Sequence, residues 1–230
     1  MELFLIRHGQ STNNALTDWS QRVEDPLLTN RGEQQAELTA RHVAAGLHLH
    51  PTARDAARPV LDQLYCSPMI RAMQTADAIA KAVGVTPQVW IDIHEVGGVY
   101  LDQGERKVGY PGRSRSELAQ RFPRCVLVPD LTENGWWNRD FEESHVGHGR
   151  AASVAKMLRE RAAEDARVGL VSHGDFLSAL LKALGGQPFD TGIYYEHRNT
   201  GITCIDLTPQ AARVRYLNRV DHLTEELDTY

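Results

Sequence analysis

The chain has 230 residues, of which 42 % are hydrophobic and 24 % charged, and its formal net charge is −5. This length suits one α/β domain with a sizeable core. The acidic balance gives no indication of a nucleic-acid surface or a polybasic membrane contact. No segment approaches the roughly 20 apolar residues that a membrane-spanning helix needs. The apolar start, residues 1–6, is too short for a signal peptide.

The cysteines favour a reducing compartment. Cys66, Cys125 and Cys204 are scattered and lack CxxC spacing. An odd number in such an arrangement argues against a disulfide framework and against a structural zinc site. We therefore expect a cytoplasmic protein without a bound metal.

The N-terminal part predicts a buried strand and then a helix. Residues 3–6 form a short apolar run that ends at Arg7-His8-Gly9, and this length suits a strand at the centre of a parallel sheet. Gly9 allows the chain to turn sharply there. Thr29 is a candidate N-cap for a helix that runs to about Leu47.

A second strand and helix are expected after a polar link at residues 50–59. Residues 61–66 are typical of a strand, and residues 69–83 of a helix with Pro68 in its favoured first turn. A short strand is expected over residues 89–93.

The pattern breaks down over residues 96–148, which are rich in glycine and proline. Only a short helix over residues 116–122 is expected there. A long insertion of this kind is usually functional or disordered. Its aromatic residues argue against disorder; they include Tyr100, Tyr110, Trp136 and Trp137.

The C-terminal part returns to a regular pattern. Helices are expected over residues 149–166 and 175–184, with a strand over residues 167–172 between them. Two further strand-like runs, residues 201–207 and 214–217, suggest a hairpin.

The alternation of strands and helices predicts the fold class. It implies an α/β fold with a mostly parallel central sheet and helices on both faces. We expect one domain over residues 1–230, in which the irregular insertion, about residues 96–148, is a cap over the active site. In such sheets, ligands bind beyond the carboxyl ends of the strands.

Ionisable side chains follow four of the expected strands. Arg7 and His8 follow the first strand, and Arg71 lies one turn inside the helix after the second. Glu95 follows the third strand and His173 the fourth. Two arginines, two histidines and a carboxylate can therefore converge in one crevice.

This set of side chains suits phosphoryl transfer. The transferred group spreads negative charge over its equatorial oxygens, so catalysis depends on positioning and on charge stabilisation. Arg7 and Arg71 can bind those oxygens, and His173 can donate to one from the other side. A neutral imidazole at His8 can attack phosphorus and form phosphohistidine. Glu95 can protonate the leaving group and then activate water if burial raises its pKa.

The motifs resemble those of the histidine phosphatase superfamily, in its phosphoglycerate-mutase-like branch. Residues 7–11 (RHGQS), with Asn14 further on, are similar to the first signature of that family, and residues 67–76 (SPMIRAMQTA) to the second. Glu95 stands where the family places its proton donor, and residues 172–174 (SHG) match the third signature. Arg-His-Gly alone is a weak signal, but three matches in the expected order are a strong one.

The resemblance implies a Rossmann-like three-layer sandwich and roles for six residues. His8 would be phosphorylated and Glu95 would be the proton donor, while the phosphate would be bound by Arg7, Asn14, Arg71 and His173. The resemblance also implies that no metal or other cofactor takes part. The expected partner is a small phosphorylated substrate, with inorganic phosphate as a product.

The resemblance covers both phosphatases and mutases. Mutases of this branch carry an Arg-Arg-Ser-Tyr segment and a proline-rich stretch, whereas the insertion here has residues 112–116 (GRSRS) and no such stretch. We therefore favour a phosphomonoesterase. The alternatives are a phosphoglycerate mutase and a catalytically silent phosphate-binding or interaction module. Because the residues around Glu95 depart from the family pattern, Asp175 is an alternative proton donor.

Two further points have structural alternatives. Asn14 can cap a turn rather than bind phosphate. The second point is the hypothesis that insertion residues wall the substrate pocket, namely Tyr100, Trp136, Trp137 and either Arg113 or Arg115. The alternative is that these residues anchor the insertion.

Overall fold

The computed structural model describes residues 1–51, 54, 57–104 and 106–230. The expected link at residues 50–59 and the insertion at residues 96–148 each include residues outside this description. The main sheet has the strand order β3-β2-β6-β1-β7-β8. Its strands are β1 (Glu2–Arg7), β2 (Gln63–Cys66), β3 (Pro87–Val89), β6 (Arg167–Ser172), β7 (Ile202–Leu207) and β8 (Ala212–Arg219). The first four are parallel, whereas β7 and β8 are antiparallel to their neighbours. The mostly parallel sheet and the C-terminal hairpin are therefore confirmed.

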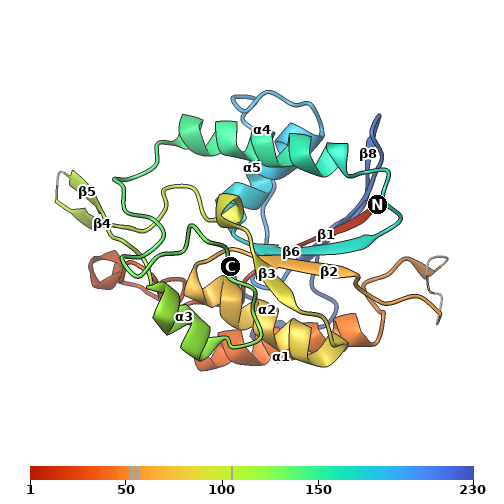
Figure 1. Ribbon diagram of the computed structural model, residues 1–230, viewed down its shortest axis with the longest axis horizontal. Coiled ribbons are helices and arrows are strands. Elements are labelled where there is room, and N and C mark those ends of the chain that lie inside the picture. The colour runs from red at the N-terminus through yellow and green to blue at the C-terminus, as the bar shows by residue number, and fades with distance from the viewer. Residues whose placement is uncertain (52–53, 55–56, 105) are drawn as a thin grey trace.

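Helices cover both faces of this sheet, as Figure 1 shows. One face carries α1 (Asn30–Ala44) and α2 (Ile70–Val83), and the other carries α4 (Ser144–Glu160) and α5 (Gly174–Leu184). Successive side chains of a strand point to opposite faces. Phe4 and Ile6 of β1 accordingly join the apolar cluster of α1 and α2, while Leu3 and Leu5 join that of α4 and α5. The predicted α/β class is confirmed. In the described part of the chain, no helix is long and apolar enough to cross a membrane.

Several element boundaries differ from the expectation: α1 ends at Ala44 rather than near Leu47, and α4 ends at Glu160 rather than at residue 166. The strand expected over residues 89–93 stops at Val89, and a 3-10 turn (Ile91–Ile93) follows it. Helix α4 begins at Ser144, before the expected start at residue 149. Gly147 lies inside this helix, and close packing explains why the residue is glycine. A Cβ there would come within 3.0 Å of the Val96 side chain.

The insertion is more regular than its sequence predicts. It contains an antiparallel hairpin of β4 (Tyr100–Gln103) and β5 (Arg106–Gly109), followed by α3 (Arg115–Arg121). Trp136 and Trp137 are buried in the same apolar cluster as α1 and α2. Gly98 has a φ of +73° and lies under Trp137, so a Cβ there would approach the indole ring to 2.1 Å. Aromatic packing therefore ties the insertion to the core.

The register of the sheet decides where the functional residues meet. Arg7 pairs with Ser172, and Cys66 pairs with Val171, so β1, β6 and β2 end at the same edge. The residues that follow these strands directly are His8, His173 and Ser67. They are therefore neighbours in space although they are far apart in the sequence.

Candidate active site

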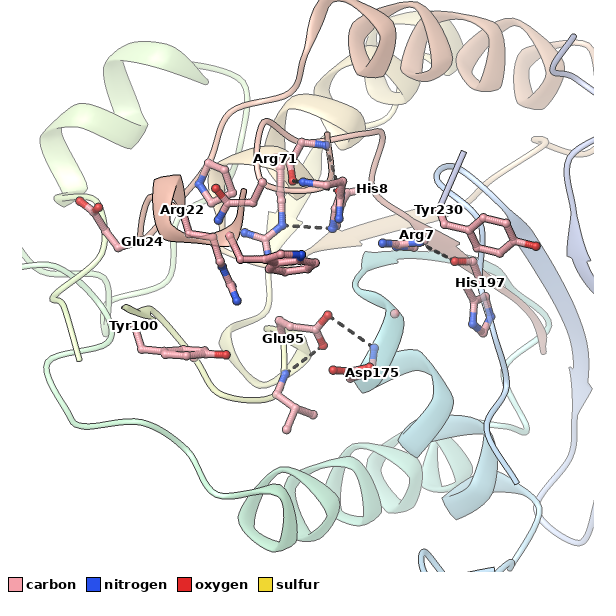
Figure 2. A pocket seen from close by; sticks show the side chains of 18 of the residues that line it. Arg7, His8, Arg22, Glu24, Arg71, Glu95, Tyr100, Asp175, His197 and Tyr230 are labelled. Carbon is pink, nitrogen blue, oxygen red and sulfur yellow. Dashed lines mark hydrogen bonds between the residues drawn. The ribbon is translucent and has the colours of Figure 1, made fainter. Parts of the chain in front are cut away.

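A pocket of about 330 Å³ opens at this edge of the sheet (Figure 2). Its lining includes five of the six predicted site residues, which are Arg7, His8, Asn14, Arg71 and Glu95. The sixth, His173, is fully buried behind the pocket, and its ring centroid lies 5.0 Å from that of His8. The structure thus brings all six residues together.

His8 is neutral and has a defined tautomer. Its Nδ1 lies 2.6 Å from the Gly9 carbonyl oxygen, which only accepts hydrogen bonds, so Nδ1 carries the proton. Arg71 Nε donates to His8 Nε2 at 3.0 Å, and Nε2 therefore presents a lone pair. Burial, together with the charges of Arg71 and Arg7, lowers the pKa of His8 well below its ordinary value.

The loop after β1 is pinned between two helices. A Cβ at Gly9 would lie 2.5 Å from the carbonyl oxygen of Gly32 in α1, so only glycine permits this approach. The Gly9 amide donates to Thr75 Oγ1 of α2 at 3.1 Å, and the Gln10 amide donates to Gln35 Oε1 of α1 at 2.7 Å. These contacts hold the His8 backbone in place.

Arg71 is tied to a buried carboxyl group. It lies in the first turn of α2, and its Nη1 is 3.8 Å from Asp25 Oδ1. The Ile70 amide donates to the same oxygen at 3.2 Å. Burial raises the pKa of Asp25 to about 6, although the charge of Arg71 opposes the rise. Asp25 therefore acts as a support for Arg71.

Arg7 and Asn14 each have a donor group that no described residue accepts from. Arg7 Nη1 donates to the His197 carbonyl oxygen at 2.6 Å, but its Nε is buried and has no acceptor among the described residues. Asn14 Oδ1 accepts from the Ser11 amide at 3.0 Å, which is the turn-capping contact that the sequence allowed. The NH₂ group of Asn14 has no hydrogen-bond acceptor in the described part of the chain, so it is available to the pocket that Asn14 lines.

His173 connects two strand ends. Its Nε2 lies 2.8 Å from Ser67 Oγ, and Ser67 Oγ accepts from the Met69 amide at 3.2 Å. The Ser67 hydroxyl can therefore donate to Nε2, which leaves the ring proton on Nδ1. The Nδ1 atom of His173 is buried and has no partner among the residues described. Burial and the charge of Arg71 lower the pKa of His173 well below its ordinary value, so this ring is also neutral.

Glu95 faces the N-terminus of α5. Its carboxylate accepts from the amides of Val96 at 2.9 Å, Phe176 at 3.0 Å and Asp175 at 3.4 Å, and Figure 2 draws the bonds from Val96 and Asp175. These bonds favour the ionised form. Burial and the negative charge of Asp175 outweigh them and raise the pKa of Glu95 to about 7. Glu95 can therefore gain or lose a proton near neutral pH.

A buried ion pair supports the segment that carries Glu95. Arg150 of α4 donates to the carbonyl oxygens of Asp92 at 2.7 Å and His94 at 2.9 Å. It also binds both carboxylate oxygens of Glu142, at 3.1 and 2.5 Å. Burial opposes ionisation of Glu142, but its contacts with His94 and Arg150 prevail and lower its pKa to about 2.

Most residues at the mouth of the pocket were not predicted. Trp19 and Arg22 lie in the loop between β1 and α1, Tyr194 lies between α5 and β7, and Tyr230 ends the chain. Tyr194 donates to Asp175 Oδ1 at 2.6 Å. No local pattern marks these residues, because they come from separate loops. Below, the rim denotes Trp19, Arg22, Tyr100, Tyr194 and Tyr230.

The insertion residues hypothesised to wall the pocket have different positions. Tyr100 lines the pocket, whereas Trp136 and Trp137 are buried in the core. Arg113 pairs with the carboxylates of Asp25 and Glu117, and Arg115 donates to the backbone carbonyls of Leu127, Val128 and Leu131. Apart from Tyr100, these residues anchor the insertion rather than line the pocket.

Comparison with known sequences agrees with this site. The model of the histidine phosphatase superfamily (branch 1) matches residues 3–220. The probable phosphoglycerate mutase GpmB of Erwinia tasmaniensis is 26 % identical over 216 residues, which cover 90 % of this chain and 85 % of that protein. A PE-PGRS family protein of Mycobacterium tuberculosis is 32 % identical over 98 residues, so the match spans 42 % of this chain and only 15 % of that protein.

Solved structures share the fold. The ecdysone phosphate phosphatase of Bombyx mori superposes with a TM-score of 0.66 at 14 % identity, covering 97 % of this chain and 95 % of that one. A phosphoserine phosphatase of Entamoeba histolytica superposes with a TM-score of 0.59 at 20 % identity, covering 97 % of this chain and 99 % of that one. Since the family model spans nearly the whole chain, the protein belongs to branch 1 of the histidine phosphatase superfamily.

Proposed function

We propose that the protein is a metal-independent phosphatase that hydrolyses small phosphomonoesters through a phosphohistidine on His8, with Glu95 as the proton donor. The observation that carries this proposal is the lone pair of His8 Nε2, which Arg71 holds in a pocket that Glu95 also lines. Only a neutral imidazole can attack phosphorus, and the buried ring of His8 has that form.

The reaction has two steps. In the first, His8 Nε2 bonds to phosphorus as the ester P–O bond breaks, and Glu95 gives its proton to the leaving oxygen. In the second, the Glu95 carboxylate takes a proton from water, whose oxygen bonds to phosphorus as the P–N bond breaks. Each cycle consumes one water, releases an alcohol and inorganic phosphate, and restores both residues.

Four residues bind the phosphoryl group in this proposal. Arg71 exchanges its bond to His8 for a phosphoryl oxygen when the nucleophile attacks. Three more donors have no acceptor in the described part of the chain: Arg7 Nε and His173 Nδ1, which are buried, and the NH₂ group of Asn14, which lines the pocket. A buried donor without a partner costs roughly 1–3 kcal/mol, and phosphoryl oxygens can relieve this cost.

The surroundings favour Glu95 over Asp175 as the proton donor. Asp175 is exposed, and its carboxylate is engaged by the Tyr194 hydroxyl. Glu95 is more shielded, and its pKa of about 7 suits both giving and taking a proton. Val96, Gly98 and Tyr100 of the insertion also line the pocket. We assign the role of a cap to this part of the insertion, within one domain.

The first test is hydrolysis of p-nitrophenyl phosphate in the presence of EDTA. The wild type should retain its turnover, and His8→Ala should lose at least about 10³-fold in kcat. Rapid quenching into base followed by mass spectrometry should find one phosphoryl group on His8. Thermal unfolding of His8→Ala controls for misfolding. Wild-type activity that needs an added metal would overturn the proposal.

A phosphoglycerate mutase is the second candidate, because the relative named for that activity matches most of the chain. A mutase returns the phosphoryl group from histidine to a hydroxyl group instead of to water. Phosphorus NMR of a reaction with 3-phosphoglycerate separates the two functions. Release of inorganic phosphate supports the phosphatase, whereas migration between the two hydroxyl positions supports the mutase. Binding of phosphorylated ligands without any turnover indicates a silent module.

A further inference from the structure

Arg22 is a cation of the pocket that has no acidic partner among residues 1–51, 54, 57–104 and 106–230. It follows the 3-10 turn Trp19–Gln21 in the loop between β1 and α1, and it lines the pocket. Among the residues that the structure describes, no carboxylate forms an ion pair with its guanidinium, and its Nε is buried without an acceptor. Buried polar groups of this kind call for an explanation.

Aromatic rings hold the guanidinium of Arg22. Its Cζ lies 5.5 Å from the ring centroid of Trp19 and 5.5 Å from that of Tyr100. Cation–π contacts hold the guanidinium in place and leave N–H groups free to bind an anion. Figure 2 shows Arg22 reaching toward the side of the pocket that Tyr100 occupies, while Glu24 points away from it. Arg22 therefore offers donors to a ligand.

Arg22 also lies near the residues that bind phosphate in the proposed function. Burial lowers the pKa of Arg71, and the positive charges of Arg7 and Arg22 act in the same direction. Asp25 partly neutralises Arg71, and the charge of Glu95 acts on Arg7. One phosphoryl group can engage Arg7 and Arg71 together, which leaves Arg22 for a second anion on the same small molecule.

We propose that Arg22 binds a second anionic group of the substrate, a carboxylate or another phosphoryl group, besides the phosphoryl group that is transferred. This inference rests on the proposed function and specifies its substrate class. A guanidinium binds an anion more strongly than it binds a neutral hydroxyl group, because the hydrogen bonds are charge-assisted on both sides. Substrates with an anion at this position are therefore preferred over matched neutral ones.

The test uses two matched pairs of probes. Glycerol 3-phosphate differs from 3-phosphoglycerate in having a CH₂OH group in place of the carboxylate, and fructose 6-phosphate lacks one phosphoryl group of fructose 1,6-bisphosphate. In at least one pair, wild-type kcat/KM should favour the anionic member by about tenfold or more. The pair that shows this preference tells whether Arg22 binds a carboxylate or a phosphoryl group.

Arg22→Gln should reduce that preference to within about twofold and change kcat/KM for the neutral member by less than about threefold. Arg22→Lys keeps a charge and should retain part of the preference. Arg106→Gln removes an exposed arginine of β5 and serves as the matched control, with the preference expected to stay at the wild-type value. Thermal unfolding checks each variant.

A wild type without preference in either pair, or a preference that survives in Arg22→Gln, would overturn the inference. Failure of the proposed function looks different, because then no phosphomonoester is hydrolysed by any variant. In that case calorimetric titration with the same pairs of compounds tests whether Arg22 binds the second anionic group. The wild type should bind the anionic member about tenfold more tightly, and Arg22→Gln should bind both members equally. Equal affinities in the wild type would contradict the proposed role of Arg22.

Discussion

The floor of the pocket, which comprises Arg7, His8, Arg71, Glu95 and the buried His173, differs from the rim in burial and in origin. His8 and Arg71 on the floor are 3 % and 8 % exposed, whereas Trp19 and Tyr194 on the rim are 65 % and 56 % exposed. The floor residues lie at or just beyond the ends of strands, in the first turn of α2, or just after the 3-10 turn Ile91–Ile93. The rim residues come from two loops, the start of β4 and the last residue of the chain.

This difference separates two tasks in the proposed function. Residues set by the register of a buried sheet keep a constant geometry, which phosphoryl transfer needs. Residues on exposed loops can change without disturbing the sheet, which suits them to substrate choice. Substitutions on the floor should therefore lower kcat, and substitutions on the rim should change KM or the preference among substrates.

Arg71 should show the largest effect among the binding residues of the floor. Arg71→Met removes a donor to the developing charge, and such a loss costs roughly 10²–10³-fold in kcat. Arg71→Lys keeps the charge without the planar fork and should give an intermediate rate. Steady-state kinetics with p-nitrophenyl phosphate measures both variants. A fall of less than threefold in a folded Arg71→Met enzyme would exclude Arg71 from phosphate binding.

Arg150 tests whether the floor depends on support from α4. Arg150→Met releases the carbonyls of Asp92 and His94 and leaves Glu142 buried without its ion-pair partner. We expect a loss of roughly 3–5 kcal/mol in the free energy of unfolding and about tenfold in kcat, because Glu95 is held less firmly. The double variant Arg150→Met with Glu142→Gln should recover stability but not kcat. Full kcat in a folded variant would contradict the positioning role.

Asp175 should set the pH dependence rather than the rate. Glu95 must be protonated to act as a donor, so kcat/KM should fall as the pH rises through about 7. The negative charge of Asp175 helps to raise this pKa, and Asp175→Asn should move the alkaline limb to lower pH by roughly 0.5–1 unit. Tyr194→Phe keeps the charge of Asp175 and serves as the control. If the limb does not move in Asp175→Asn, Glu95 is not the group that titrates.

Trp19 should show the smallest effect. Trp19→Ala removes one of the two rings that hold Arg22, while Tyr100 remains. An exposed cation–π contact is worth roughly 0.5–1 kcal/mol. We therefore expect KM to rise about two- to fivefold for a substrate with a second anion, with kcat unchanged. A comparable fall in kcat would show that the rim takes part in the chemistry.

The sequence alone determined the fold class and the composition of the floor. His8 and His173 directly follow strands that the sequence predicts, and Arg71 follows a helix start marked by Ser67-Pro68. Strand ends of a parallel sheet meet at one edge, so local pattern was enough to bring these residues together. The sequence pattern placed the start of helix α4 too late, because Gly147 resembles a turn residue. In the structure this glycine lies inside the helix and is required by its contact with Val96.

Only the tertiary structure decided the rim and the supports behind the floor. Arg22 contacts Tyr100 because the hairpin of the insertion lies beside the loop after β1. Arg150 of α4 donates to the backbone carbonyl of His94, the residue before Glu95. Strand and helix signals are local and periodic, whereas contacts between loops depend on where the whole chain places them. The sequence therefore predicts the floor of this pocket, and the packing of distant segments determines the rest.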